Sequence, residues 1–423
     1  MRLLSLCCFA LLSTGLWGQK LLVLNGGLFG SATETANLGV YDPADDSYQF
    51  LDSMGTNSVQ DLLIEDDQYA YVAAQDSIYK YDLQTGDRLA AAAFGSVSTI
   101  KLGLYQNKLL VGNWYGSSSD NLRIFDKSDL SFQSSISQID KGVKDFVVLG
   151  DTLYIAQNSS TASYTDTLGY LAKVNLTDNS YIGNDTLSST GNELGRLFSL
   201  GDSLIIGINN ESNSLSYLNI NSGQKWTQSA AVNFQAPSYG HAVQLDQNGI
   251  AYTVYDGAVG SYDFINNTVI DTALIPYASG AFALDAQNGF LYVSQVNFGD
   301  QSTNTGIRYN LSGDSLGTFP VGFSPEVLVI WNTQLLNNLT EVASPTLNFG
   351  LFPNPVSQSL TINLEEAQLG QYRIYNNLGQ LLGQGLFSGQ QKQIDVQNLD
   401  AGIYHILLQT EQGQQSTQQF IKR

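Results

Sequence analysis

Histidine is scarce in this chain, and this limits the acid–base and metal chemistry that it could perform. Only two histidines occur, His241 and His405. They do not form the His-x-x-x-His spacing of a zinc site, and no Ser-His-Asp set stands out. A carboxylate could still act as a general base, and the candidate group is His241 with Asp256 or Glu326. We assign no catalytic residue.

The carboxylates are dense only in two short runs. Asp45-Asp46 and Glu65-Asp66-Asp67 fit solvated turns, because Asp side chains bond backbone two residues further on. A calcium role is the alternative, although the Asp-x-Asp-x-Asp-Gly loop of calcium sites does not occur. We therefore predict no metal and no organic cofactor.

The charge balance restricts the partners. Lys and Arg number 18 against 38 Asp and Glu, which gives a net charge of −20 and a pI near 4.2. Phosphate binding needs clustered basic residues, so we expect neither nucleic acid nor anionic lipid as a partner.

Aromatic residues and amides gather in four segments that suit binding better than catalysis. The segments cover residues 25–37, 113–121, 157–169 and 295–306, and are rich in Ser, Thr, Asn and Gly. Ring faces pack on apolar surfaces of sugars or peptides, while amides and hydroxyls fix hydrogen bonds. The alternative is that the rings pack inward and hold long loops. The aromatic candidates are Phe29, Trp114, Tyr115, Tyr164 and Phe298.

A repeat indicates which elements position these segments. Each copy is an apolar strand that ends in an aromatic or aliphatic residue followed by Asp or Asn. Copies recur every 40 to 49 residues, which with about four strands per unit is typical of a β-propeller. We predict an all-β, seven-bladed propeller. The repeated positions are Tyr41, Tyr81, Phe125, Val174, Leu218, Tyr262 and Tyr309.

The two ends of the repeat region should complete one blade. Lys20 to Leu24 corresponds to a second strand, and the missing first strand lies at Ser324 to Ile330. Pairing these segments closes the ring and leaves no open sheet edge. Loops from second to third strands then share one face with the connections between blades, so the four segments come together there.

Second strands end in amides often enough to predict a partial polar ring at the channel mouth. These amides could equally satisfy backbone groups at strand ends. The candidate ligand-binding positions of this ring are Asn25, Asn113, Gln157 and Gln295, with Tyr255 in the sixth blade.

The strand pairs of several blades carry a family resemblance. Leu153-Tyr154-Ile155-Ala156 and Leu291-Tyr292-Val293-Ser294 resemble the YncE-like, or YVTN, branch of seven-bladed propellers. The resemblance covers about residues 20–331. It implies a fold more than an activity, since propellers host enzymes, receptors and scaffolds.

The last 75 or so residues form a second module, whose alternating strands and turns predict a small Ig-like β-sandwich. It opens with Phe352-Pro353-Asn354-Pro355-Val356 and closes with Phe420-Ile421-Lys422-Arg423. The motif series resembles, in order, the type A C-terminal sorting domain of proteins exported by the type IX secretion system of Bacteroidetes. The positions that carry the signal are Pro353, Asn354, Pro355, Gly379, Gly402, Tyr404 and Lys422.

That resemblance implies a route and two partners. The sorting domain would be recognised by the translocon at the outer membrane and removed by a sortase within about residues 340–352. The propeller would then be attached to surface lipopolysaccharide or released.

The N-terminus agrees with export. Met1-Arg2 and the apolar run Leu3 to Leu12 are typical of a signal peptide, with cleavage expected before Gln19. Cys7 and Cys8 raise lipidation as an alternative. We find no segment long enough for a transmembrane helix. The predicted organisation is a signal peptide at 1–18, a propeller at 19–331, a linker at 332–348 and the sorting domain at 349–423.

The function predicted from the sequence is that of a secreted or surface-attached propeller. It would bind a glycan, a peptide or a surface protein through one loop face. The alternatives are a propeller lyase or hydrolase and a structural surface-layer component. The enzyme alternative requires polar side chains within hydrogen-bond reach of one another at the channel mouth. The surface-layer alternative predicts that the propeller self-associates and binds no small ligand.

Overall fold

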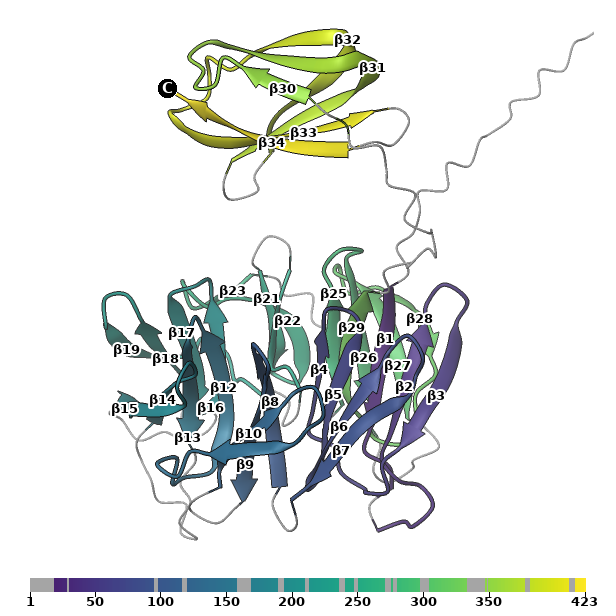
Figure 1. Ribbon diagram of the computed structural model, residues 1–423. Coiled ribbons are helices and arrows are strands. Elements are labelled where there is room, and N and C mark those ends of the chain that lie inside the picture. Colours follow the sequence, from purple (N-terminus) through teal and green to yellow (C-terminus); the bar gives the residue numbers. More distant parts are fainter. Residues whose placement is uncertain are drawn as a thin grey trace, which may run out of the picture. The chain divides into compact units, whose positions relative to one another are not determined.

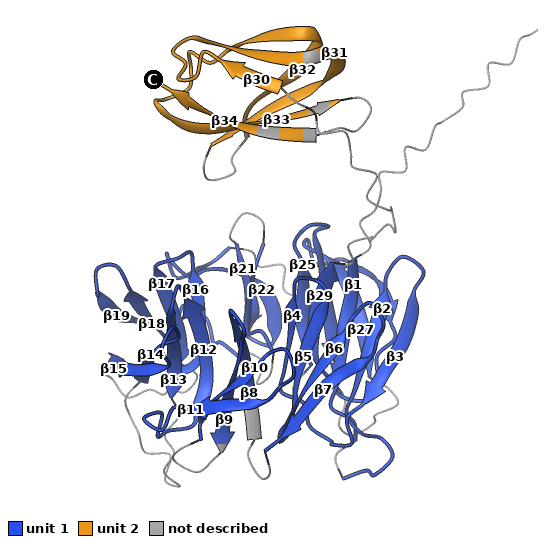
Figure 2. Cartoon of the chain, in the orientation of Figure 1, with its two compact units in different colours: residues 1–335 blue, residues 336–423 orange. Residues whose placement is uncertain are grey.

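A computed structural model shows an all-β chain that divides into two compact units, residues 1–335 and 336–423 (Figure 2). The N-terminal segment that we predict to be a signal peptide lies outside the described residues, as does nearly all of the predicted linker. The structure describes residues 19–423 except 29, 95–97, 116–119, 158–168, 189–193, 210–212, 236–239, 247–249, 271–274, 277–279, 297–303, 333–346, 348, 377–380 and 411–414.

The first unit consists of seven antiparallel sheets, numbered here as blades 1–7, arranged around a central axis (Figure 1). Blade 1 contains β29 (Pro325–Asn332), β1 (Gln19–Asn25), β2 (Asn37–Asp42) and β3 (Ser47–Ser53). Blade 2 contains β4 (Asp61–Glu65), β5 (Tyr69–Ala74), β6 (Ser77–Asp82) and β7 (Arg88–Ala93). Blade 3 contains β8 (Ser98–Tyr105), β9 (Lys108–Tyr115), β10 (Leu122–Asp126) and β11 (Phe132–Ser135).

The other four blades follow in chain order. Blade 4 contains β12 (Val143–Leu149), β13 (Thr152–Gln157), β14 (Gly169–Asn175) and β15 (Ser180–Ser188). Blade 5 contains β16 (Leu194–Leu200), β17 (Leu204–Asn209), β18 (Ser214–Asn219) and β19 (Lys225–Ser229). Blade 6 contains β20 (Val243–Leu245), β21 (Ala251–Tyr255), β22 (Ala258–Asp263), β23 (Thr268–Val269) and β24 (Ile275–Pro276). Blade 7 contains β25 (Phe282–Asp285), β26 (Phe290–Gln295), β27 (Thr305–Asn310) and β28 (Ser315–Phe319).

The predicted ring closure is confirmed. The last strand, β29, pairs with β1 in antiparallel register, with Leu22 opposite Val329 and Leu24 opposite Val327. The second strands are buried on both faces, as in the YAYVAA sequence of β5. One apolar cluster fills each of the seven seams between neighbouring blades. The core is therefore distributed around the ring.

The repeated Asp or Asn at the end of the third strand makes the predicted turn. The Oδ1 of Asp82 accepts a hydrogen bond from the backbone N–H of Gln84 at 2.8 Å. In other blades, Asp126 bonds Ser128 and Asp263 bonds Ile265 in the same way. These carboxylates hold turns at the ends of blades and are structural groups.

The second unit is one nearly closed sheet around its own core. Its strands are β30 (Phe349–Phe352), β31 (Ser359–Asn376), β32 (Leu381–Asp395), β33 (Gly402–Thr410) and β34 (Gln415–Lys422), in the order β30-β31-β33-β34 with β32 paired to β31. A register break between Asn363 and Gln368 divides the pairing of β31 with β32 into two halves. The two layers of the predicted sandwich are therefore parts of a single sheet. β31 and β32 are long enough to contribute to both layers.

Candidate ligand-binding site

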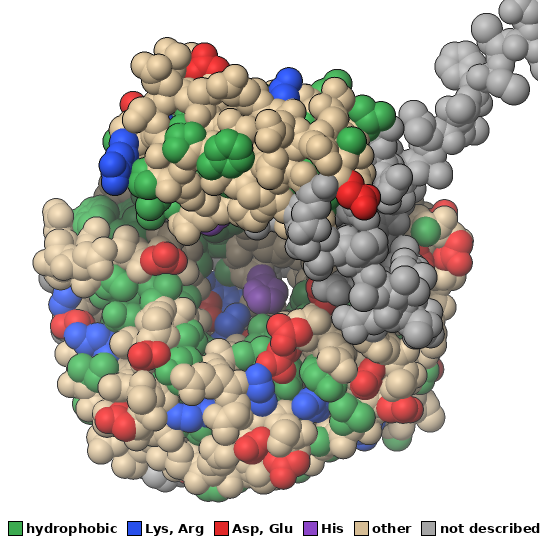
Figure 3. Space-filling view, turned by 45° about the horizontal axis from the view of Figure 1, so that its top comes forward, with side chains coloured by type: hydrophobic (Ala, Val, Ile, Leu, Met, Phe, Trp, Pro, Cys, Tyr) green, Lys and Arg blue, Asp and Glu red, His purple; other side chains and the backbone are tan. Residues whose placement is uncertain are grey.

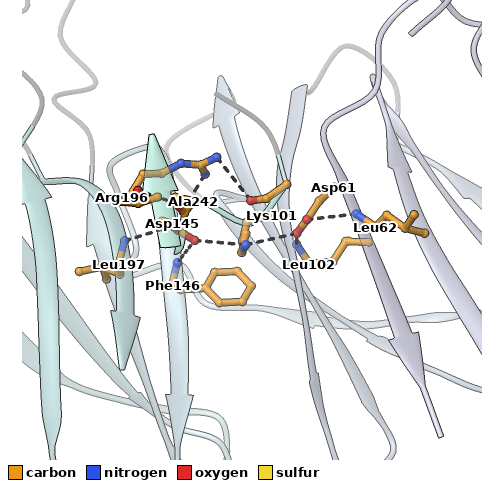
Figure 4. Close-up of polar contacts among 11 residues, drawn as sticks. Asp61, Leu62, Lys101, Leu102, Asp145, Phe146, Arg196, Leu197 and Ala242 are labelled. Atoms are coloured by element: carbon orange, nitrogen blue, oxygen red, sulfur yellow. Dashed lines mark hydrogen bonds and ion pairs between the residues drawn. The ribbon is translucent and has the colours of Figure 1, made fainter. Parts of the chain in front are cut away.

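Charged residues lie in the first half of the innermost strands of four successive blades and line the hollow of the ring. Asp61, Lys101, Asp145 and Arg196, here called the channel network, alternate in sign around the axis (Figure 4). Each occupies the same register position, opposite Ala73, Gly112, Ala156 and Ile208 respectively. All four are at least nine-tenths buried. Figure 3 shows the hollow, with basic, acidic and histidine side chains gathered in it.

The network is paired internally. The Lys101 ammonium lies 3.7 Å from Asp61 and 3.5 Å from Asp145, and Arg196 lies 3.7 Å from Asp145. Two positive charges therefore balance two negative charges inside the ring. Because a buried charge without a partner is costly, this alternation allows four ionised groups to remain there.

Both carboxylates of the network also join neighbouring blades. Asp61 accepts the backbone N–H of Leu62 at 3.0 Å and, from the next blade, that of Leu102 at 2.9 Å. Asp145 in turn accepts the N–H of Phe146 at 2.9 Å and that of Leu197 in the following blade at 3.1 Å. These hydrogen bonds connect neighbouring blades, so both carboxylates have a structural role in the ring.

The residues before β20 reach across the hollow. The N–H of Gly240 donates to the carbonyl of Gln60 in blade 2 at 2.9 Å, and the Gly240 carbonyl accepts from Arg196 in blade 5 at 3.4 Å. Gly240 has a φ of +65°, and a Cβ there would lie 2.9 Å from Val327 of blade 1. Only glycine fits this crossing.

His241 follows this crossing and lies within the field of the channel network. Burial and then the Lys101 ammonium lower its pKa, so the imidazole is neutral at pH 7. Asp256 is in the exposed turn between β21 and β22, where its Oδ1 accepts the N–H of Asn233. The predicted pairing of His241 with Asp256 does not form, because that carboxylate is used in a rim turn.

Glu326 is the other carboxylate that we considered for catalysis. Burial raises its pKa to about 7, and a hydrogen bond of 2.5 Å from the Ser324 hydroxyl lowers it in part. Glu326 lies in β29, in the blade that closes the ring. The charged groups with the largest effects on the pKa of His241 are Lys101, Asp61 and Asp145.

The predicted binding residues fall into four groups. Asn25 is fully buried and bonds Asn37, Tyr48 and Gly322, while Tyr255 packs in an aromatic cluster and donates to the Ser261 carbonyl. Gln295 ends β26 half-buried. Phe29, Tyr164, Phe298 and the side chain of Tyr115 lie outside the described residues.

The remaining predicted residues come from blades 3 and 4. β9 continues to Tyr115, so Asn113 and Trp114 are strand residues rather than loop residues. Residues two apart in a strand point to the same side. Asn113 follows Val111 toward blade 2, whereas Trp114 follows Gly112 toward blade 4.

Trp114 meets the start of blade 4. Gly142 packs so closely on the Trp114 backbone that a Cβ there would collide with the Trp114 carbonyl oxygen. The Lys144 ammonium lies 4.0 Å from the centre of the Trp114 ring. Beside it, the Lys141 ammonium lies 4.7 Å from the ring centre of Tyr170 in β14. Each half-buried ring thus has a cation over one face.

Gln157 faces the same seam. It pairs with Val143 on one side and Tyr170 on the other, and cross-strand partners share one face of a sheet. Val143 packs in the cluster between blades 3 and 4. Gln157 is 2% exposed, and its Nε2 finds no hydrogen-bond partner among the described residues. We call Trp114, Lys141, Lys144, Gln157 and Tyr170 the seam site.

The sequence reasoning missed three residues of the seam site, namely Lys141, Lys144 and Tyr170. The available signal was the Lys-Gly-Val-Lys run immediately before an innermost strand, in a chain where basic residues are rare. Within the described residues, no group of three or more His, Cys, Asp or Glu is placed to hold a metal ion. The same part of the chain contains no helix long and apolar enough to cross a membrane.

In the second unit, the predicted sorting residues connect its two ends. Asn354 donates to the Gln419 carbonyl at 3.1 Å and accepts the N–H of Ile421 at 2.9 Å, between the cis prolines Pro353 and Pro355. Lys422 forms a parallel β-bridge with Val356, and the Tyr404 hydroxyl donates to the Asp400 carbonyl. Gly402 begins β33, and Gly379 lies outside the described residues.

Comparison with known families decides the identity of this unit. Residues 350–423 match the secretion system C-terminal sorting domain. The chain carries an export tail. The predicted location, secreted or at the cell surface, is confirmed by this tail, which also implies contact with the type IX secretion machinery.

Solved structures are similar to the propeller. A putative 6-phosphogluconolactonase from Bacteroides fragilis is similar over 75% of this chain and 99% of its own, with 13% identity and a TM-score of 0.55. Another, from Bacteroides uniformis, is similar over 74% and 100%, with 13% identity and a TM-score of 0.51. At this identity the likeness shows the fold alone. No curated protein sequence matches the chain.

Proposed function

We propose that this chain is an exported binding propeller of a Bacteroidetes bacterium, and that it takes a saccharide or a peptide at the seam site. The YncE-like type, a signal peptide over 1–18, the propeller limits 19–331, the linker 332–348 and the sorting domain limits 349–423 are parts of this proposal. The export tail and the propeller fold support it.

The observation that carries the proposal is the composition of the seam site. Two cation–ring pairs and one buried amide nitrogen without a partner among the described residues lie along the seam between blades 3 and 4. A buried donor without an acceptor lowers stability, and an acceptor atom supplied by a ligand would offset that cost. Aromatic faces beside convergent polar groups are typical of ligand sites.

Trp114→Ala is expected to weaken ligand binding about 30-fold, or roughly 2 kcal/mol, because it removes one ring of the site. The measurement is the thermal unfolding midpoint of residues 19–423 against a panel of oligosaccharides and peptides. A ligand at a hundredfold excess over its Kd stabilises the native state by about 2.7 kcal/mol. The variant should lose most of the shift.

Trp226→Ala is the matched control. Trp226 lies on the outer strand β19, where it stacks on Tyr217 away from the seam site. It should lose stability but keep the ligand-induced shift. If no panel member shifts the wild-type midpoint, the proposal fails and a structural surface component is favoured.

Deleting residues 350–423 is expected to abolish export, because this segment is the sorting tail. The shortened chain should accumulate inside the cell envelope of a host that has the type IX system, as measured by fractionation and immunoblotting. Asn354→Ala should reduce export in part, since it removes two bonds between the ends of the domain. Wild-type surface levels of the truncated chain would contradict this assignment.

A further inference from the structure

We propose that the secretion machinery docks on one aliphatic face of the export tail, and that the partner is a protein surface that is itself apolar and uncharged. The family match gives the tail a partner in that machinery but no contact surface. This inference rests on the export part of the proposed function and specifies where the contact is made. Exposed leucines and isoleucines of four strands form the face, here called the aliphatic face, namely Leu369, Leu382, Leu386, Ile403 and Ile421.

The pairing of the strands places these side chains on one side of the sheet. Cross-strand partners share a face, as do residues two apart in one strand. Leu386 of β32 lies opposite Gln371 of β31, which is two residues from Leu369. The two leucines are therefore diagonal neighbours about 7–8 Å apart. On the other two strands, Ile403 lies directly opposite Ile421.

Half-buried side chains connect these two pairs across the same side of the sheet. Tyr375 of β31 pairs with His405 of β33, and Arg373 pairs with Leu407. His405 lies two residues from Ile403, so the row of side chains is continuous from β32 to β34. The alternate residues of these strands point the other way and fill the core of the unit. The aliphatic face is thus an outer surface, which the domain does not need for its own core.

The exposure of the aliphatic face differs from that of the propeller surface. Leu386 is 76% exposed and Leu369 is 53% exposed. Single exposed apolar residues are ordinary, whereas a contiguous group marks an interaction site. The large apolar residues exposed on the propeller are spread over the outer strands of different blades, for example Phe50, Leu89, Phe132, Ile182 and Leu316.

The charge of the tail indicates the chemistry of the partner. The segments that form the aliphatic face, 369–376, 381–388, 402–408 and 415–422, contain no Asp or Glu. Residues 350–423 have 4 Lys and Arg against 5 Asp and Glu, whereas the rest of the chain has 14 against 33. The cores of protein interfaces are depleted of charge and rich in apolar area. A nearly neutral tail with an aliphatic face therefore fits an apolar protein surface better than a charged one.

The test measures export of the full chain in a host that has the type IX system. The double variant Leu369→Gln with Leu386→Gln should lower the fraction of the chain at the cell surface about 5-fold or more, because it removes two apolar contacts. Leu386→Glu alone should lower it further than Leu386→Gln, since an unpaired charge would be buried against the partner. Leu386→Met keeps an apolar side chain and should be exported like the wild type.

Two controls separate docking from folding and from general surface effects. Leu89→Gln replaces a leucine that is 50% exposed on β7 of the propeller, and it should leave export unchanged. Hydrogen exchange over residues 350–423 should be the same in the double variant as in the wild type. If the tail of the double variant loses protection, Ile403→Gln with Ile421→Gln tests the face from its other side by the same export criterion.

The outcomes distinguish this inference from the export assignment. Export of the double variant at the wild-type level, with no export of a chain that lacks residues 350–423, would overturn the inference alone. Export of the shortened chain would overturn both. Purified residues 19–423 are also tested for flotation with neutral phospholipid vesicles and for sedimentation as a dimer. Either behaviour, if lost in the double variant, would identify a lipid surface or a second copy as the occupant and overturn the inference.

Discussion

Asp145→Ala is expected to lower the free energy of unfolding of the propeller by about 3–5 kcal/mol. The substitution removes the acceptor of the Phe146 and Leu197 N–H groups, and the carboxylate between Lys101 and Arg196. Both cations are at least nine-tenths buried. Without Asp145, Lys101 keeps only Asp61 of its two carboxylates, and Arg196 loses its carboxylate partner in the network. Urea unfolding followed by circular dichroism measures the change.

Asp140→Ala is the matched control for this prediction. Asp140 is the same residue type a few positions earlier in the chain, but it is exposed. Its removal should change stability by no more than about 0.5 kcal/mol. A double-mutant cycle with Arg196→Met should show strong coupling, since the two groups share one network. A loss below about 1 kcal/mol for Asp145→Ala would show that the channel network does not hold the blades.

Glu326→Gln is expected to remove a pH dependence of stability. The pKa of Glu326 is raised from 4.5 to about 7 in the folded chain, so the folded state binds its proton more tightly than the unfolded state. This stabilisation is complete below pH 4.5 and is lost as the pH rises toward 7, by about 3 kcal/mol in all. The variant should match the wild type at pH 4 and exceed it at pH 8.

Glu34→Gln controls for the loss of a carboxyl group. Glu34 is exposed, so its replacement should leave the slope of stability against pH unchanged. The turn carboxylates Asp126 and Asp263 have lowered pKa values, and their contribution is lost only as the pH falls through those values, outside this window. A Glu326→Gln variant that parallels the wild type from pH 4 to 8 would contradict the account.

The fold could be predicted because its signals are local and repeated. Each blade ends its third strand with an aromatic or aliphatic residue and a turn Asp or Asn, and seven copies determine the number of blades. The closure was predictable because Lys20 to Leu24 lacked a first strand and Ser324 to Ile330 supplied it. The number of blades and the ring closure can therefore be predicted from the alternation of strands and turns alone, without knowing how the side chains pack.

The site was predictable only in part, because it depends on which way side chains point. Trp114 and Gln157 were identified, and alternation along their strands brings both to one seam. Asn25 has the same position in its blade as Gln157. Its side-chain amide, however, forms three hydrogen bonds with other residues of the chain and so has a structural role. Sequence reasoning treated the two alike.

The channel network could not be predicted for a different reason. Asp61, Lys101, Asp145 and Arg196 lie about 40 to 50 residues apart, each within a short strand of otherwise ordinary composition. Their pairing exists only after the ring places the innermost strands side by side. The crossing by Gly240 likewise depends on contacts with three other blades.

The most direct test of the central claim is a crystal structure of residues 19–423 grown with the panel ligand that gives the largest shift in unfolding midpoint. The account predicts that the ligand lies at the seam between blades 3 and 4, against Trp114 and Tyr170, with an oxygen near the Gln157 Nε2. A ligand bound in the central hollow beside His241, or on the outer strands, would contradict it.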